Sequence, residues 1–150
     1  MFLVEIARGT LAKVSANGAA SIVADLGGSP NGIAIGPDGV AYICNNGGFS
    51  WIERGDLLFR GHAVNAETCA SIQRVDVPTV AVATLYASFE SDPLKGSNDI
   101  VYDLDGGFWF TGHGQVRGTA RDHGAIYHAK ADKSGITRQR NEIMGPNLPN

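Results

Sequence analysis

Only two cysteines, Cys44 and Cys69, occur in this chain of 150 residues. They do not form a Cys-x-x-Cys pair, and no histidine stands at metal-binding spacing from either of them. A disulfide framework or a zinc site built on cysteine pairs is therefore not indicated. We interpret both residues as small hydrophobes, with a disulfide or a reactive thiol as the alternative.

The sequence also lacks an excess of positive charge, a long apolar run and a secretion signal. Its net charge is −3 and its pI is about 5.7, so no basic surface for nucleic acid is indicated. The longest apolar runs are too short to cross a bilayer. We therefore expect a cytoplasmic protein with no nucleic-acid or membrane partner. Because a strand pattern follows Met1 directly, we also expect a segment to be missing upstream.

No stretch shows the 3.6-residue period of an amphipathic helix, so we predict no substantial helix. The 20 glycines stand at turn positions between short apolar runs, which favours an all-β protein. The pattern predicts strands at 2–6, 10–14, 21–26, 32–35, 40–44, 71–75, 81–86, 125–131 and 136–140, with a hairpin over 99–111.

Two segments share one plan. Ser97–Gly114, SNDIVYDLDGGFWFTGHG, and residues 31–45, NGIAIGPDGVAYICN, each open with an asparagine, form a strand, turn at Asp-Gly and leave as a second strand. The offset is constant, since 98 − 31 = 67 for the asparagines and 105 − 38 = 67 for the turn aspartates. A third copy begins at Pro149-Asn150. A repeated hairpin of this kind predicts a repeat architecture.

The repeating unit has about 40–50 residues, the size of a four-stranded propeller blade. The expected fold is thus a β-propeller, of which this chain holds about three four-stranded antiparallel blades. A propeller closes its ring to hide its sheet edges, so we expect residues 1–150 to be a partial domain, truncated at both ends. Its open blade faces should then favour self-association.

Residues 45–70 are the least regular part of the chain and show neither the helical nor the strand period. We interpret them as an insertion between the second and third strands of a blade. Loops of this length often act as lids or partner contacts.

Three asparagines, Asn31, Asn98 and Asn150, begin the three copies of the repeat. Each is able to cap a strand by bonding nearby backbone, or to point toward the axis of a propeller and offer its amide oxygen to a cation. For Asn31 we favour the cap. His113 leaves the second hairpin and is a candidate to face the channel.

The remaining aromatic and imidazole side chains are assigned to packing or to the surface. We expect three aromatic residues to pack the blades, namely Tyr42, Phe108 and Trp109. The other histidines, His62, His123 and His128, show no ligand spacing and are expected at the surface.

The segments PNGIAIGPDGVAYICNNGG at 30–48, SNDIVYDLDGGFWFTGHG at 97–114 and GAIYHAKAD at 124–132 together resemble the senescence-marker/gluconolactonase/luciferin-regenerating-enzyme family. The resemblance covers essentially all 150 residues, as the N-terminal half of the family without its first strands. It implies a six-bladed propeller that binds a divalent cation, such as calcium, zinc or magnesium, in its channel and hydrolyses sugar lactones.

The resemblance also implies site residues. Asn98 is similar to the asparagine that lines the family's channel on the substrate side, and Asn150 to the asparagine that holds the metal. We expect Asn98 and Asn150 as metal ligands, and Asn98 with His113 at the substrate. The family's other ligands, a Glu and an Asp, fall before Met1 and after Asn150, and we expect the general base outside the chain as well. An Arg that the family's lactonases place two residues before the substrate-side Asn is Gly96 here, beside Lys95.

Three hypotheses on function follow. The first is a fragment of a metal-dependent lactonase-like hydrolase of the gluconolactonase type, whose small-molecule substrate is a sugar lactone or similar cyclic ester. The second is a non-catalytic propeller module that binds a ligand or protein, because fold alone does not fix function. The third is a truncated product that does not fold alone. Under the first hypothesis the complete protein is an enzyme, while the 150 residues by themselves are expected to be inactive.

Overall fold

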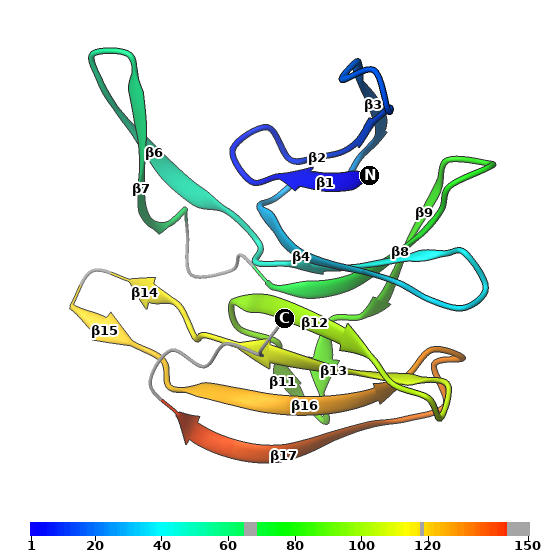
Figure 1. Ribbon diagram of the computed structural model, residues 1–150. Coiled ribbons are helices and arrows are strands. Elements are labelled where there is room, and N and C mark those ends of the chain that lie inside the picture. The colour runs from blue at the N-terminus through cyan, green and yellow to red at the C-terminus, as the bar shows by residue number, and fades with distance from the viewer. Residues whose placement is uncertain (65–68, 118, 144–150) are drawn as a thin grey trace.

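Three antiparallel sheets lie beside one another in the computed structural model, which describes residues 1–64, 69–117 and 119–143 (Figure 1). The first sheet has the order β1 (Phe2–Glu5), β2 (Thr10–Val14) and β3 (Ala20–Asp25). The second has the order β4 (Pro30–Ile35), β5 (Ala41–Asn45), β8 (Ser71–Asp76) and β9 (Ala81–Tyr86). The third has the order β12 (Ser97–Tyr102), β13 (Gly107–Gly112), β16 (Gly124–Lys130) and β17 (Ile136–Ile143).

These sheets are the predicted blades of an all-β propeller, and the described residues contain no helix. Each blade is an antiparallel meander, and β4 and β12, the first strands of the second and third blades, run side by side. The first sheet has three strands, which correspond to those predicted at 2–6, 10–14 and 21–26. No helix that could span a membrane occurs in the described part of the chain.

Three short hairpins extend from the connections between the main strands. They are formed by β6 (Phe49–Arg54) with β7 (Leu57–Ala63), β10 (Ser88–Phe89) with β11 (Asp92–Pro93), and β14 (Val116–Arg117) with β15 (Ala120–Arg121). The β6–β7 hairpin is an insertion between β5 and β8, as predicted, but its strands were not. Its side chains are exposed on both faces, so its sequence carries no alternation between apolar and polar residues.

The β5 strand shows how one blade packs against two neighbours. Its residues are all buried because alternate side chains point to opposite faces. Ala41 and Ile43 pack with Leu11 of the first sheet. Tyr42 and Cys44 belong to a second cluster, which includes Phe108 of the third sheet. Burial of both faces thus joins the three blades into one unit.

Aromatic rings fill the contact between the second and third blades. Phe108 is fully buried, and its ring centroid lies 5.5 Å from that of Tyr42 and 6.2 Å from that of Phe110. The predicted packing roles of Phe108 and Tyr42 are therefore confirmed. Trp109 instead lies at the surface, 37% exposed, with its ring against that of His128. The next residue along a strand faces the opposite side, which explains the difference.

Cys44 and Cys69 do not form a disulfide with each other. Cys44 is buried in the core, and its Sγ lies 3.5 Å from the backbone oxygen of Asp99. Burial raises the pKa of the Cys44 thiol well above its usual value, so this residue behaves as a small hydrophobe. Cys69 is exposed.

His128 is paired rather than simply exposed at the surface, which corrects the sequence expectation. Its Nε2 lies 2.7 Å from Asp103 Oδ2, and the other Asp103 oxygen accepts the backbone N–H groups of Asp105 and Gly107. Partial burial alone would raise the pKa of Asp103, but the hydrogen bonds from Gly107 and His128 lower it overall.

The lowered pKa of Asp103 predicts a pH-dependent contribution to stability. A carboxyl whose pKa is lower in the folded state than in the unfolded state stabilises the fold at pH values above its unfolded-state pKa, which is about 4. This stabilisation is lost as the pH falls through the folded-state pKa. We expect Asp103→Asn to lower the melting temperature at pH 7, and the difference from wild type to shrink below about pH 4. Thermal unfolding followed by circular dichroism between pH 3 and 7 measures this. A difference that stays constant over that range would contradict it.

The turn between β8 and β9 contains a strained residue. Val80 has φ 61°, a left-handed conformation that β-branched side chains disfavour. We expect Val80→Gly to raise the free energy of unfolding by about 1 kcal/mol. Val82→Gly is the matched control, because Val82 lies in β9 with no positive φ, and glycine there should destabilise the strand. Chemical denaturation measures the free energy of unfolding of both variants. Equal effects of the two substitutions would contradict the claim that the backbone at Val80 is strained.

Candidate functional site

The first strands of two blades bring Asn31 and Asn98 together. Each is the second residue of its strand, in β4 and β12, and Asn31 Nδ2 donates a hydrogen bond to Asn98 Oδ1. Asn31 and Asn98 therefore lie close together, whereas Asn150 lies outside the described residues. The side chain of Asn31 reaches the next blade, so its interpretation as a strand cap alone is wrong.

Gly32 allows the two strands to approach so closely. A Cβ atom on Gly32 would collide with the backbone oxygen of Asn98 and lie 2.9 Å from the Cα of Asp99. Backbone atoms cannot move aside as a flexible side chain does, so any larger residue would push β4 and β12 apart. The asparagine pair therefore depends on the glycine that follows Asn31.

Buried polar atoms gather at the same edge of the sheets. The backbone pairing aligns Pro30 with Asn45, and Ser97 with Gly112. The first residues of β4 and β12 and the last residues of β5 and β13 therefore lie at this edge. Three buried side-chain oxygens have no hydrogen-bond partner among the described residues: Oγ of Ser29, Oγ of Ser97 and Oδ1 of Asn46. Buried polar groups are normally paired in the working protein, so this edge is suited to hold polar ligands or water.

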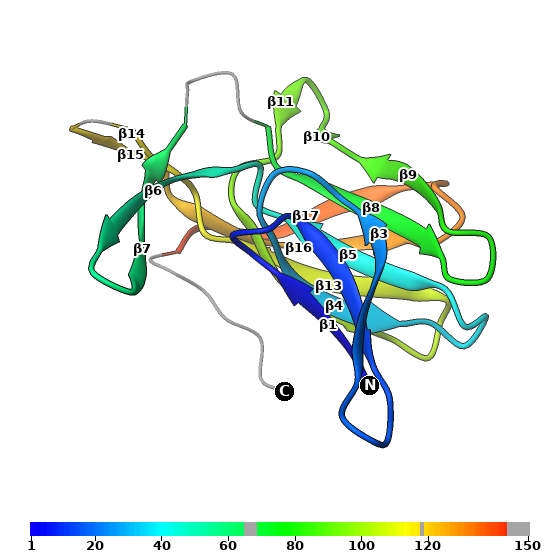
Figure 2. The same ribbon diagram turned by 90° about the horizontal axis from the view of Figure 1, so that it is seen from above.

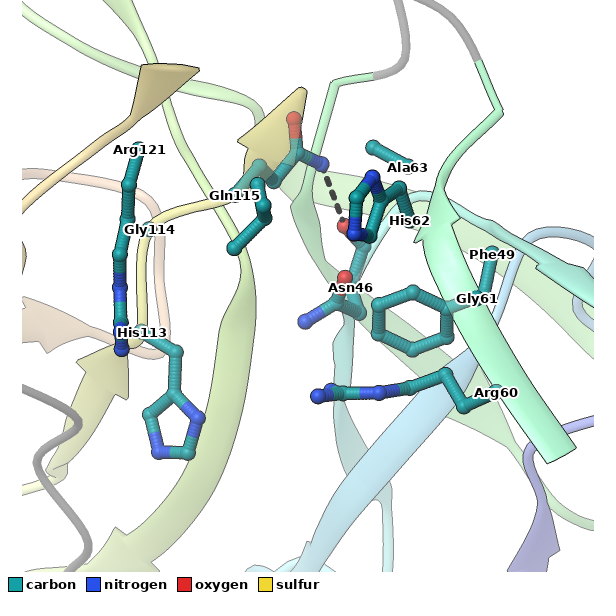
Figure 3. Close-up of a pocket in the computed structure, with 11 residues that line it drawn as sticks. Asn46, Phe49, Arg60, Gly61, His62, Ala63, His113, Gly114, Gln115 and Arg121 are labelled. Carbon is teal, nitrogen blue, oxygen red and sulfur yellow. Dashed lines mark hydrogen bonds between the residues drawn. The ribbon is translucent and has the colours of Figure 1, made fainter. Parts of the chain in front are cut away.

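A cavity of about 100 Å³ opens at this edge between the β6–β7 hairpin and the segment after β13 (Figure 3). Its lining includes Asn46, Phe49, Arg60, His62, His113 and Arg121. The β6–β7 and β14–β15 hairpins project from this end of the molecule in both views (Figures 1 and 2).

Hydrogen bonds connect the cavity floor to the segments that lead into β4 and β12. Gln115 Nε2 donates to the backbone oxygen of Asn46 over 3.1 Å, and the Asn46 N–H donates to the backbone oxygen of Ser29 over 2.9 Å. The His113 N–H donates to the backbone oxygen of Gly96 over 2.8 Å. The predicted site residue His113 therefore lines this cavity and is bonded directly to Gly96, in the segment that leads into β12.

Sequence reasoning missed Asn46, Arg60 and Gln115 as cavity residues. A signal for Asn46 was present, because the offset of the repeat pairs it with His113: 113 − 46 = 67. The two equivalent positions of successive blades line one cavity. Arg60 comes from the β6–β7 hairpin, which is longer than the β14–β15 hairpin at the equivalent place in the third blade, so the offset of the repeat does not pair Arg60 with a hairpin residue.

A family model described as SMP-30/Gluconolactonase/LRE-like region matches residues 1–149. The chain belongs to this family. Among solved structures, a crystal structure provisionally described as a gluconolactonase is similar at 17% sequence identity, with a TM-score of 0.63. The match covers 93% of this chain and 43% of that one, and at this identity it shows the fold alone. The search of curated proteins found no match.

The place of the family's arginine in this SMP-30/gluconolactonase/LRE-like chain is closed to a side chain. Gly96 has φ 64°, and a Cβ atom there would lie 3.1 Å from the backbone carbon of Gly114. Its neighbour Lys95 does not replace an arginine, because its Nζ pairs with Asp122 Oδ1 at 3.4 Å. The described structure therefore places no arginine or free-standing substitute for it at this position.

The donors at this edge do not match the metal site that the family implies. Among the described residues, no group of three His, Cys, Asp or Glu side chains could hold a metal ion. Asn98 Oδ1 is a neutral oxygen that already accepts one hydrogen bond. A hard divalent cation prefers several oxygen ligands that include carboxylates. The described residues by themselves therefore do not fit a metal site.

Proposed function

We propose that this chain forms part of a metal-dependent, lactonase-like hydrolase that opens a sugar lactone or a similar cyclic ester. Membership of the SMP-30/gluconolactonase/LRE-like family supports the reaction class. The observation that carries the proposal is the contact of Asn31 with Asn98 across two blades, at an edge that also holds unpaired buried oxygens.

The chain's own contribution is to orient polar groups toward a substrate. An amide oxygen can accept two hydrogen bonds, and Asn31 supplies one of them to Asn98. This bond fixes the orientation of the Asn98 amide, so that the amide can position the hydroxyl groups of a lactone. The hydroxyl oxygens of Ser29 and Ser97, which have no hydrogen-bond partner among the described residues, lie at the same edge.

The cation and the general base belong to the complete protein in this proposal. Asn150 and Asn98 would each offer a neutral oxygen, and carboxylates from outside the 150 residues would complete the ligand set. A bound divalent cation, such as calcium, zinc or magnesium, would polarise the lactone carbonyl. The described residues do not make up this site, so we assign no step of the reaction to it and expect the 150-residue chain alone to be inactive.

Lactone hydrolysis by the complete protein tests the proposal. Acid release from a sugar lactone is followed by pH-stat, before and after treatment with a chelator and after metal is added back. We expect turnover that the chelator abolishes and metal restores. Turnover that is unchanged after chelator treatment would reject metal dependence. Lactone binding without any turnover would instead favour the alternative of a non-catalytic propeller module.

Two further expectations stay predictions. One is the cytoplasmic location, and the other is self-association of the isolated chain. The β6–β7 hairpin offers exposed apolar side chains for such contacts, among them Ile52, Leu57, Leu58 and Phe59.

A further inference from the structure

The cavity between the β6–β7 hairpin and the segment after β13 has two permanently charged side chains in its lining, Arg60 and Arg121. None of the described lining residues is acidic. No ion pair within residues 1–64, 69–117 and 119–143 involves either arginine. Two like charges around one small cavity repel each other, so this lining favours an anionic ligand, even in a chain with a net charge of −3.

The carboxylate that follows Arg121 in the sequence belongs to a different pocket. Asp122 Oδ1 lies 3.4 Å from Lys95 Nζ, and Asp122 Oδ2 accepts the backbone N–H of Gln115 over 3.3 Å. Asp122 and Lys95 line a second pocket that does not include Arg121. Successive residues of an extended chain point to opposite sides, which separates the arginine from the carboxylate. The positive charge of the cavity is therefore retained.

Arg60 is held in place above the cavity. Its guanidinium carbon lies 4.7 Å from the ring centroid of Phe49, and Figure 3 shows the arm reaching from the hairpin toward His113. Stacking on an aromatic face restricts the arginine before any ligand arrives. The N–H groups lie in the guanidinium plane, so stacking leaves them available to an acceptor.

Hydrogen-bond donors reach the cavity from opposite sides. Figure 3 shows Arg60 and His62 on the side of the hairpin, and His113 and Arg121 on the other side. Between them lies Asn46, which is only 3% exposed and whose amide nitrogen is directed into the space between His113 and Arg60. Guanidinium, imidazole and amide N–H groups are all donors. Such an arrangement suits a ligand whose acceptor oxygens point in several directions.

A phosphoryl group meets these requirements better than a carboxylate. A phosphate monoester carries a charge of about −1.5 to −2 at pH 7 and three strong acceptor oxygens. This charge matches two arginines, and the tetrahedral arrangement of the oxygens allows contacts with both sides of the cavity. A carboxylate has a single charge and two oxygens in one plane, which one guanidinium can satisfy by itself.

We propose that this cavity binds the phosphoryl group of a small phosphate monoester, with Arg60 and Arg121 as its charge partners. The rest of the ligand extends out of the cavity. Its volume of about 100 Å³ is well below the roughly 300–1,000 Å³ of pockets that hold whole drug-sized ligands. The site does not rest on the proposed function, because none of its residues belongs to the Asn31–Asn98 pair.

Calorimetric titration of the full chain with glycerol 3-phosphate tests the site. Two comparison probes at matched ionic strength separate charge from geometry: acetate is a planar monoanion, and dimethyl phosphate is tetrahedral but carries one charge and only two terminal oxygens. We expect glycerol 3-phosphate to bind at least about tenfold more tightly than either, and inorganic phosphate to displace it. No detectable binding of glycerol 3-phosphate, or equal binding of acetate or dimethyl phosphate, would overturn the site.

Arginine variants locate the phosphoryl group. Arg60→Gln and Arg121→Gln should each weaken binding of glycerol 3-phosphate by about tenfold to a hundredfold, because hydrogen bonds to a charged group are lost. Both side chains are exposed, so the melting temperature should stay unchanged. Arg54→Gln is the matched control: Arg54 stands on the same hairpin and stacks on Phe59, but does not line the cavity. Equal effects of Arg54→Gln and Arg60→Gln would overturn the assignment.

Asn46→Asp tests whether the ligand enters the cavity. It replaces the amide donor with a carboxylate of the same shape between the two arginines, so binding of glycerol 3-phosphate should fall below detection. Asn46→Ala, which only removes the donor, should lower the affinity less, and circular dichroism checks that both variants fold. Unchanged binding in folded Asn46→Asp would contradict the site. Loss of lactone turnover in the complete protein, with glycerol 3-phosphate binding intact, would reject only the proposed function.

Discussion

Replacement of Phe108 by alanine is expected to lower the free energy of unfolding by about 3–5 kcal/mol. The Phe108 ring is fully buried and contacts the rings of Tyr42, Tyr86, Tyr102 and Phe110. These residues come from both the second and the third blades, so the cavity left by the substitution would open at their interface. Ordinary domains have only about 5–15 kcal/mol of stability, so this single change removes a large share.

Trp109→Ala is the control for Phe108→Ala. It removes a larger ring from the next position of the same strand, but that ring is partly exposed and lies against His128. We expect an effect of about half or less, measured by chemical denaturation. Phe108→Leu keeps much of the volume and provides a measurable variant if the alanine form does not fold. A larger effect for Trp109→Ala than for Phe108→Ala would contradict the finding that the Phe108 face of β13 packs into the core.

Replacement of Asn98 by alanine should reduce lactone turnover by the complete protein about 100-fold or more, as expected when one preorganised polar group is removed from a reacting centre. The substitution removes the amide that receives the Asn31 hydrogen bond. Initial rates by pH-stat measure the effect. Asn17→Ala is the control, because Asn17 bonds only within the exposed turn between β2 and β3 and should leave turnover unchanged.

Asn31→Ala separates positioning from direct contact. It leaves the Asn98 amide in place but removes the hydrogen bond that orients it. We therefore expect a smaller loss of turnover than for Asn98→Ala, and almost no further loss when both asparagines are replaced, because the two act as a unit. Losses that multiply in the double variant would show that the two asparagines act independently.

The repeat in the sequence predicted much of the fold. The constant offset of 67 identified two blades and placed Asn31 and Asn98 in equivalent positions, and hydrogen bonding between them follows from the side-by-side packing of β4 and β12. Short apolar runs between turn residues also identified the buried strands, because both faces of β5 pack against other blades.

The parts that sequence reasoning missed lack such a repeated or alternating signal. The β6–β7 hairpin is exposed on both faces, so no period marks its strands, and Arg60 could not be assigned to the cavity. Asp103 holds the turn of the third blade with its side chain, while Gly36 occupies the equivalent place in the second blade, where Asp38 takes over by bonding Val40. Equivalent turns thus use different residues, and spacing alone does not reveal which carboxylate forms the bonds.

The central claim is that ligand binds where Asn31 and Asn98 meet. It is tested most directly by NMR of the complete protein labelled with ¹⁵N at asparagine, titrated with a lactam that mimics the lactone without being hydrolysed. We predict that the side-chain amide signals of Asn31 and Asn98 shift as the lactam binds, while the signal of Asn17 stays in place. Inhibition of turnover by the lactam with no shift at Asn31 or Asn98 would contradict the account.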